Sequence, residues 1–107
     1  MRIEALIHHF PDGSPDEEVC RFEEWDEQNN HCCRMIFTDA VLKAHYVLNP
    51  ISILPEHRKD FNGSKKVGFP EDDNDVQTTL LFKEALKHQI QNDDAFEGYE
   101  WTVTERD

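Results

Sequence analysis

The sequence has few of the features that mark membrane, secreted or phosphate-binding proteins. No apolar run in it approaches the roughly 20 residues that span a bilayer. An acid interrupts the short apolar stretch at the N-terminus, and no small-residue cleavage site follows it, so we expect no signal peptide and a cytoplasmic location. The phosphate-loop patterns G-x-G-x-x-G and G-x-x-x-x-G-K-[ST] are both missing.

Cysteine is scarce, and its spacing disfavours disulfides and metal sites. The chain has three cysteines, Cys20, Cys32 and Cys33, and an odd number cannot form a closed disulfide framework. Zinc sites usually draw on tight pairs such as C-x2-C, which this chain lacks. His31 and Cys33 would share a face of a strand, but Cys20 would lie roughly 13 Å from Cys33 at the usual strand rise. We therefore expect reduced thiols, no bound metal and no cofactor.

Basic residues are few relative to acids. Eleven lysines and arginines stand against 23 acids, which gives a net charge of −12. Such an excess repels nucleic acid and anionic membranes and attracts basic surfaces. Residues 51–70 are the exception, because four bases and two acids give that segment +2 and leave −14 on the rest of the chain. The charge predicts a basic protein partner, with no direct binding of nucleic acid or membrane, and says nothing of oligomeric state.

The length and the apolar content are those of one small domain. A chain of 107 residues is one domain on the usual size prior, and hydrophobic residues make up 37% of it. That content is enough for one modest hydrophobic core that needs no disulfide or metal ion to stabilise it. We therefore treat residues 1–107 as a single acidic domain.

The first half of the chain predicts strands. Residues 2–10 alternate partly, and residues 11–15 are all turn formers. Residues 18–25 and 31–38 form a hairpin whose paired positions sum to 57, as a four-residue loop would give. In this register Glu23 lies opposite Arg34, and Phe22 shares a face with Met35.

The second half predicts one main helix and a closing strand. Residues 39–48 are ambiguous: Thr38 or Asp39 could cap a short helix, but a strand is preferred. Residues 49–74 read as a long irregular stretch. Residues 75–92 form the helix, and residues 99–104 form a strand with aromatic side chains on one face. The fold class is therefore α+β, an antiparallel sheet of four to five strands packed against one main α-helix. The apolar face of the helix comprises Val76, Leu80, Leu81, Phe82, Ala85, Leu86 and Ile90.

No residue set predicts catalysis. Cys32 and Cys33 stand beside His31 and Arg34, but a nucleophilic cysteine needs a lowered pKa, and a hairpin strand is an unusual place for one. Acids are so numerous that a pair suited to acid–base chemistry can be found anywhere. The lysines of residues 62–66 more simply belong to a surface turn. We therefore expect no catalytic residue and no enzymatic activity.

The acid clusters are the best candidates for contact with a partner. Carboxylates placed where phosphates would sit block the cleft of a nuclease and speed association. We expect a non-catalytic inhibitor, an immunity protein or antitoxin that forms a 1:1 complex with a basic, nuclease-type toxin. A phage-type anti-defence protein, a nucleic-acid mimic and a small adaptor or oligomer-forming domain are the alternatives, and basic residues 57–66 are a second possible contact surface. The candidate partner-binding residues are Glu71, Asp72, Asp73, Asp75, Asp93 and Asp94.

Overall fold

The computed structural model describes residues 1–61, 66–68 and 76–106. Strands alternate with short helical segments along these ranges. In chain order the elements are β1 (Arg2–His8), β2 (Glu17–Glu27), β3 (Asn30–Phe37), helix α1 (Ala40–Leu48), β4 (Ile51–Ser52), the 3₁₀ segment η1 (Pro55–Phe61), β5 (Lys66–Val67), helix α2 (Val76–Gln91), the 3₁₀ segment η2 (Asp94–Phe96) and β6 (Tyr99–Glu105).

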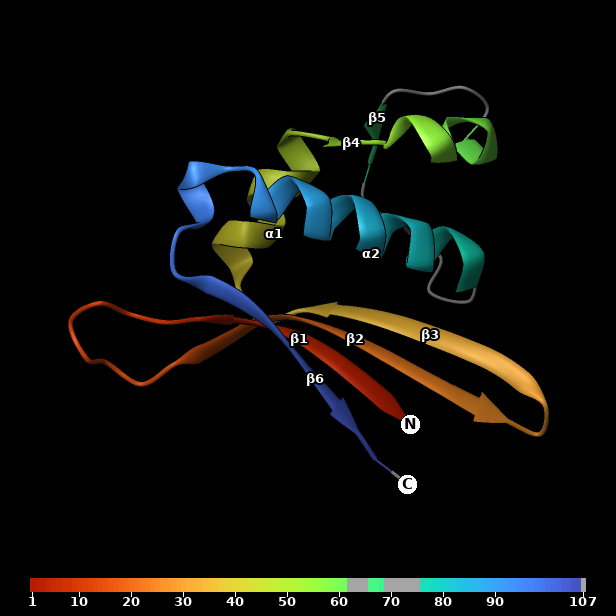
Figure 1. The fold of residues 1–107 in the computed structure, drawn as a ribbon, viewed down its shortest axis with the longest axis horizontal. Coiled ribbons are helices and arrows are strands. Elements are labelled where there is room, and N and C mark those ends of the chain that lie inside the picture. The colour runs from red at the N-terminus through yellow and green to blue at the C-terminus, as the bar shows by residue number, and fades with distance from the viewer. Residues whose placement is uncertain (62–65, 69–75, 107) are drawn as a thin grey trace.

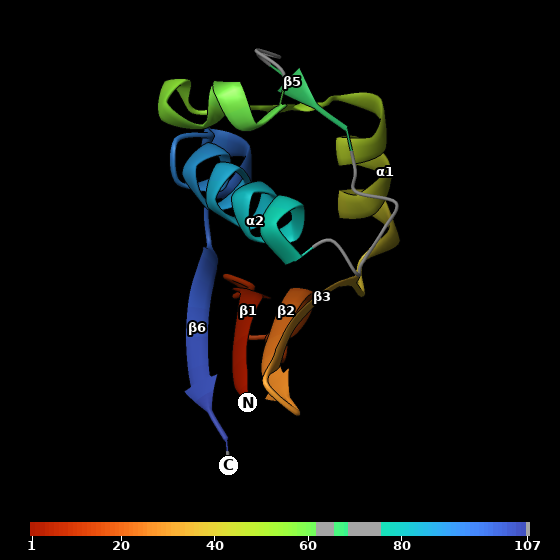
Figure 2. The same ribbon diagram turned by 90° about the vertical axis from the view of Figure 1, so that its right-hand side faces the viewer.

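Four strands form an antiparallel sheet in the order β3-β2-β1-β6. In Figure 1 both labelled α-helices lie above this sheet, and Figure 2 shows the same arrangement after a quarter turn. The closing strand β6 pairs with β1, so the two ends of the chain meet, and Arg106 N donates to Met1 O over 2.7 Å. The α+β class expected from the sequence is confirmed, with α2 as the main helix on the sheet.

The hairpin register is confirmed, although the loop is shorter than expected. Glu23 pairs with Arg34, and the ladder continues to Glu27 opposite Asn30. Only Gln28 and Asn29 remain in the turn, with φ of 54° and 64°. Two successive left-handed residues match the twist of the strands, which is the geometry that two-residue hairpins favour. Adding one pair to the end of the ladder leaves the sum of paired positions unchanged, so the register survives the shorter loop.

The strand preferred for residues 39–48 is wrong, because this segment is the helix α1. Asp39 caps it, and Asp39 Oδ1 accepts from Leu42 N over 2.8 Å. Leu42 and Tyr46, four residues apart, are buried on one face, whereas Val41 is 80% exposed. A cap together with a buried pair at helical spacing outweighs the local preference of residues 46–48 for strand.

The irregular stretch expected for residues 49–74 is also wrong over its described part. Strands β4 and β5 pair there, with Ile51 opposite Val67, and η1 lies between these two strands in the chain. Ile51 and Ile53 are buried against α2, so this segment covers the far side of the helix. The burial of Ile51 and Ile53 explains why the described part of this segment has regular structure despite its prolines and glycines.

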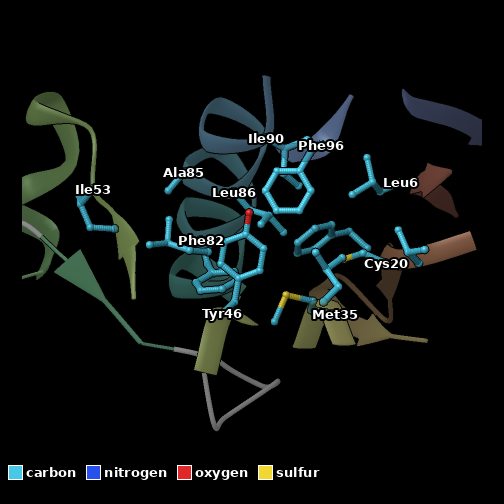
Figure 3. Packing of buried hydrophobic residues seen from close by; sticks show 14 residues of the cluster. Leu6, Cys20, Met35, Tyr46, Ile53, Phe82, Ala85, Leu86, Ile90 and Phe96 are labelled. Atoms are coloured by element: carbon cyan, nitrogen blue, oxygen red, sulfur yellow. The ribbon is translucent and has the colours of Figure 1, made fainter. Parts of the chain in front are cut away.

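The core lies between the sheet and the helices. Figure 3 shows its side chains converging from β1, β2 and β3 on one side and from α1 and α2 on the other. Burying an aromatic or branched side chain contributes about 1.5–3 kcal/mol. The cluster consists of Leu6, Val19, Cys20, Phe22, Met35, Leu42, Tyr46, Ile51, Ile53, Phe82, Ala85, Leu86, Ile90 and Phe96.

Tyr46 carries a buried hydroxyl that contributes no hydrogen bond within the described residues. Burial raises the pKa of this phenol. Since desolvating an unpaired hydroxyl costs about 1–3 kcal/mol, Tyr46→Phe should leave the free energy of unfolding unchanged or raise it by about 1 kcal/mol. Urea denaturation measures this, with Tyr99→Phe as a partly exposed control. A clear loss of stability on Tyr46→Phe would show that the hydroxyl has a partner.

Helix α2 occupies the predicted range, but its buried face differs from the expected one. Phe82, Ala85, Leu86 and Ile90 are buried as expected. Val76, Leu80 and Leu81 are only half-buried, and Lys83, which is not part of the expected apolar face, is buried. Among the described residues, no helix combines the length and apolar character that crossing a membrane requires.

Lys83 is buried because two carboxylates of the sheet receive it. Its Nζ lies 2.6 Å from Glu24 Oε1 and 3.4 Å from Glu4 Oε2. Lys87, one turn further along α2, also binds Glu4, and its Nζ lies 5.8 Å from the centre of the Trp101 ring. Glu4 is 2% exposed, so this buried ion network fixes how α2 sits on β1 and β2 and offers a substrate little access.

The buried ion network makes stability depend on pH. Burial opposes ionisation of Glu4, but Lys87 and Lys83 outweigh it and hold the pKa of this carboxyl below its usual 4.5. The stabilisation is therefore present above pH 4.5 and lost as the pH falls through the lowered, folded-state pKa. The excess of surface acids acts in the opposite direction, since protonation relieves its repulsion. The Glu4→Gln variant has the same surface acids as the wild type, so their effect cancels in a comparison of the two proteins. The difference in free energy of unfolding between them should therefore shrink as the pH is lowered from about 6 to about 2, as urea denaturation measures. A difference that stays constant would contradict this role of Glu4.

Candidate partner-binding surface

The end of helix α2 presents two of the predicted contact residues. Asp93 caps η2, and its Oδ1 accepts from Ala95 N over 2.9 Å. Asp94 follows and is exposed. The other four predicted contact residues, Glu71, Asp72, Asp73 and Asp75, lie outside the described residues. The structure therefore locates only the Asp93-Asp94 part of the predicted surface.

Asp93 and Asp94 belong to an acidic cleft of about 680 Å³, lined also by Glu97 and Glu100. We use "acidic cleft" for these four carboxylates and the space between them. Within the part of the chain that the structure describes, none of the side chains that line it is basic. Gly98, at φ 87°, turns the chain from η2 into β6 and so places the four acidic residues along one hollow. A Cβ at this position would lie 3.1 Å from His9 O, so a larger residue would disturb the turn.

Apolar rings form the floor of the acidic cleft. Phe96, Tyr99 and Trp101 line it from η2 and from one face of β6. Trp101 packs against the core, and its ring centre lies 5.9 Å from that of Phe22. Rings held by a core and flanked by carboxylates suit contact with arginine and lysine side chains, whose stems are apolar and whose ends are charged.

A second cleft lies on the other side of Asp93 and Asp94. It has a volume of about 570 Å³, and Ser52–Pro55 together with His88, Gln89 and Asn92 complete its lining. Asp93 and Asp94 thus lie between the two clefts and contribute negative charge to both of them.

His9 ties the acidic cleft to the connection between β1 and β2. Its Nδ1 lies 2.9 Å from Asp16 Oδ2, and its Nε2 lies 3.1 Å from Glu100 Oε2. Both nitrogens donate only in the imidazolium form. The hydrogen bond to Asp16, joined by Glu100, raises the pKa of His9 above its usual 6.5.

This arrangement predicts how the imidazole titrates. Because the folded pKa is raised, the His9 contacts are fully present below pH 6.5 and are lost as the pH rises through the folded-state pKa. An NMR titration should therefore place the His9 midpoint above 6.5, and Asp16→Asn should bring it back toward that value. A His9 midpoint that Asp16→Asn does not move would contradict the arrangement.

The adjacent cysteines Cys32 and Cys33 lie on opposite faces of strand β3. Cys33 is buried on the helix-facing side, whereas Cys32 lies on the outer face of the sheet opposite Trp25. Burial raises the pKa of the Cys20 thiol, which disfavours the nucleophilic thiolate. Among the described residues, no group of three or more histidines, cysteines and acids could hold a metal ion.

Glu97 and Glu100 are the contact candidates that sequence reasoning missed. Alternation predicted the strand that carries Glu100, but it gave no sign that this strand starts in the same hollow as the end of α2. The two ends lie close because η2 joins them within eight residues, so the cleft is lined by one continuous segment. The cluster of acids from Asp93 to Glu100 was the available signal.

No family model matches this chain, and no curated protein or solved structure resembles it significantly.

Proposed function

We propose that this protein is a non-catalytic inhibitor that binds a basic protein partner in the cytoplasm, acting as an immunity protein or antitoxin against a nuclease-type toxin. The observation that carries the proposal is the acidic cleft, a hollow that four acidic and three aromatic residues line on a chain of net charge −12. A nuclease binds phosphates through a basic cleft, and carboxylates can occupy the same positions.

The charge and the rings would act at different stages of binding. The net negative charge accelerates encounter with a basic surface and loses this effect as salt rises. Phe96, Tyr99 and Trp101 are held by the fold before binding, so little conformational entropy is lost when a partner covers them. Affinity would then come from the rings and selectivity from the carboxylates around them.

A tagged pull-down tests the proposal. The protein is captured from its native cell at low salt, the bound material is eluted in salt steps, and mass spectrometry identifies it. We expect one basic protein at 1:1 stoichiometry that salt releases. The purified partner should then lose its nuclease activity on titration with this protein, reaching full inhibition at one equivalent. Failure to recover any stoichiometric basic protein would refute the proposal.

A further inference from the structure

A third pocket, which shares Phe96 and Tyr99 with the acidic cleft, brings together five segments of the chain. It has a volume of about 420 Å³ and lies between the end of β1, the start of β2, the start of α1, η2 and the start of β6. We call it the aromatic pocket. Its ring side chains are His8, Phe10, His45, Phe96 and Tyr99.

The rings of the aromatic pocket form a continuous packed series. His8 stacks on Tyr99 at 4.1 Å with the planes 8° apart, and Phe10 meets His8 at 4.2 Å. Phe96 meets the edge of Tyr99 at 5.4 Å and that of His45 at 6.0 Å. Because each ring is held by its neighbour, the wall of the pocket is formed before any ligand arrives.

Two carboxylates give the aromatic pocket a negative charge. Glu17 lies at the start of β2, and Asp39 caps α1. The cap uses Asp39 Oδ1, and the second oxygen of a capping carboxylate can still accept hydrogen bonds. Burial raises the pKa of Tyr99, and the charges of Asp39 and Glu17 raise it further, so their field reaches the phenol at the wall. This field disfavours an anionic ligand.

We propose that the aromatic pocket binds the guanidinium group of an arginine side chain that the basic partner presents. A guanidinium is flat, stacks on aromatic rings and donates in pairs to carboxylates, whereas an ammonium group does only part of this. Val41, 80% exposed at the rim, can cover the apolar stem of the arginine. The inference rests on the proposed function for its source of arginine, but the chemistry of the pocket can be tested alone.

The test titrates the full chain with N-acetyl-arginine-methylamide and follows backbone amides by NMR. We expect saturable shifts centred on Phe10, Asp39 and Tyr99. The citrulline analogue, which has the same shape but no charge, and the lysine analogue should each bind about tenfold more weakly. Equal binding of either analogue, or shifts spread evenly over the acidic surface, would overturn the proposal.

A matched pair of variants checks the carboxylates. Glu17→Gln with Asp39→Asn removes both charges, and asparagine still caps the helix. We expect about a tenfold loss of arginine binding at an unchanged melting temperature. Glu84→Gln with Glu105→Gln removes two exposed charges elsewhere and should leave binding unchanged. Equal losses in both double variants would overturn the pocket.

The same variants separate this inference from the proposed function. If the pocket binds arginine and no basic partner is recovered, the pocket stands and the proposed function fails. If a recovered partner binds the Glu17 and Asp39 double variant as tightly as the wild type, the proposed function stands and the pocket is not where the partner binds.

Discussion

Replacing Lys83 with methionine is expected to lower the free energy of unfolding by about 3–5 kcal/mol, because Glu24 loses its lysine and the buried Glu4 keeps only Lys87. Glu4 is 2% exposed, and Lys83 Nζ lies 2.6 Å from Glu24. Methionine fills much of the same space, so the loss reports on charge rather than on a cavity. Urea denaturation, followed by the fluorescence of the tryptophans, measures it.

Glu84 provides the matched control for this substitution. It is the next residue of α2 and is exposed, so Glu84→Gln should change stability by no more than about 0.5 kcal/mol. Adding Glu4→Gln to Lys83→Met should recover part of the loss, since one buried charge is then removed with its partner. Lys87 would lose its contact with Glu4, but it is 27% exposed and can extend to water. A loss below about 1 kcal/mol for Lys83→Met alone would mean that water reaches the network.

Neutralising the acidic cleft is expected to slow association with the basic partner by roughly ten- to hundredfold at low salt. The variant combines Asp94→Asn, Glu97→Gln and Glu100→Gln, and it leaves Asp93 in place because that residue caps η2. Stopped-flow or surface-based kinetics with the partner recovered from the cell measure the rate. At about 1 M salt the Debye length falls to about 3 Å, so the difference in association rate between the variant and the wild type should almost vanish.

A second triple variant tests whether position matters or only net charge. Asp26→Asn, Glu84→Gln and Glu105→Gln neutralise three exposed acids on other parts of the surface. Both variants raise the net charge from −12 to −9, three acids fewer in each case. If the two triple variants slow association equally, the net charge of the whole protein steers the partner, and the acidic cleft has no role of its own in association.

The sequence predicts the parts of this fold that depend on neighbouring residues. The alternation of β2 and β3 and the Glu23–Arg34 pair set the hairpin register, and the apolar spacing of residues 76–90 sets α2. Residues 39–48 were misread because strand and helix patterns coincide there. The Asp39 cap could be seen in the sequence, but the burial of Tyr46, which comes from packing, could not.

The candidate sites could be predicted only in part. Asp93 and Asp94 were found from their charge alone, and Glu100 follows them in the same segment. The aromatic pocket joins segments from His8 to Tyr99 that only the fold brings together. The burial of Lys83 was likewise not predicted. A lysine on a helix usually faces water, and nothing near it in the sequence announces that Glu4 and Glu24 receive it.

The pairing of β1 with β6 also governs how the protein can be handled. Met1 N donates to Arg106 O over 2.5 Å, and Arg106 N donates back, so both ends of the described chain leave the sheet at one place. That place is seven strand residues from Tyr99, about 20 Å at the usual rise, which keeps fused tags and surface tethers away from the acidic cleft. A short linker could join the two ends and new ones could be opened in the turn at residues 11–15, giving a circular permutant with the same sheet.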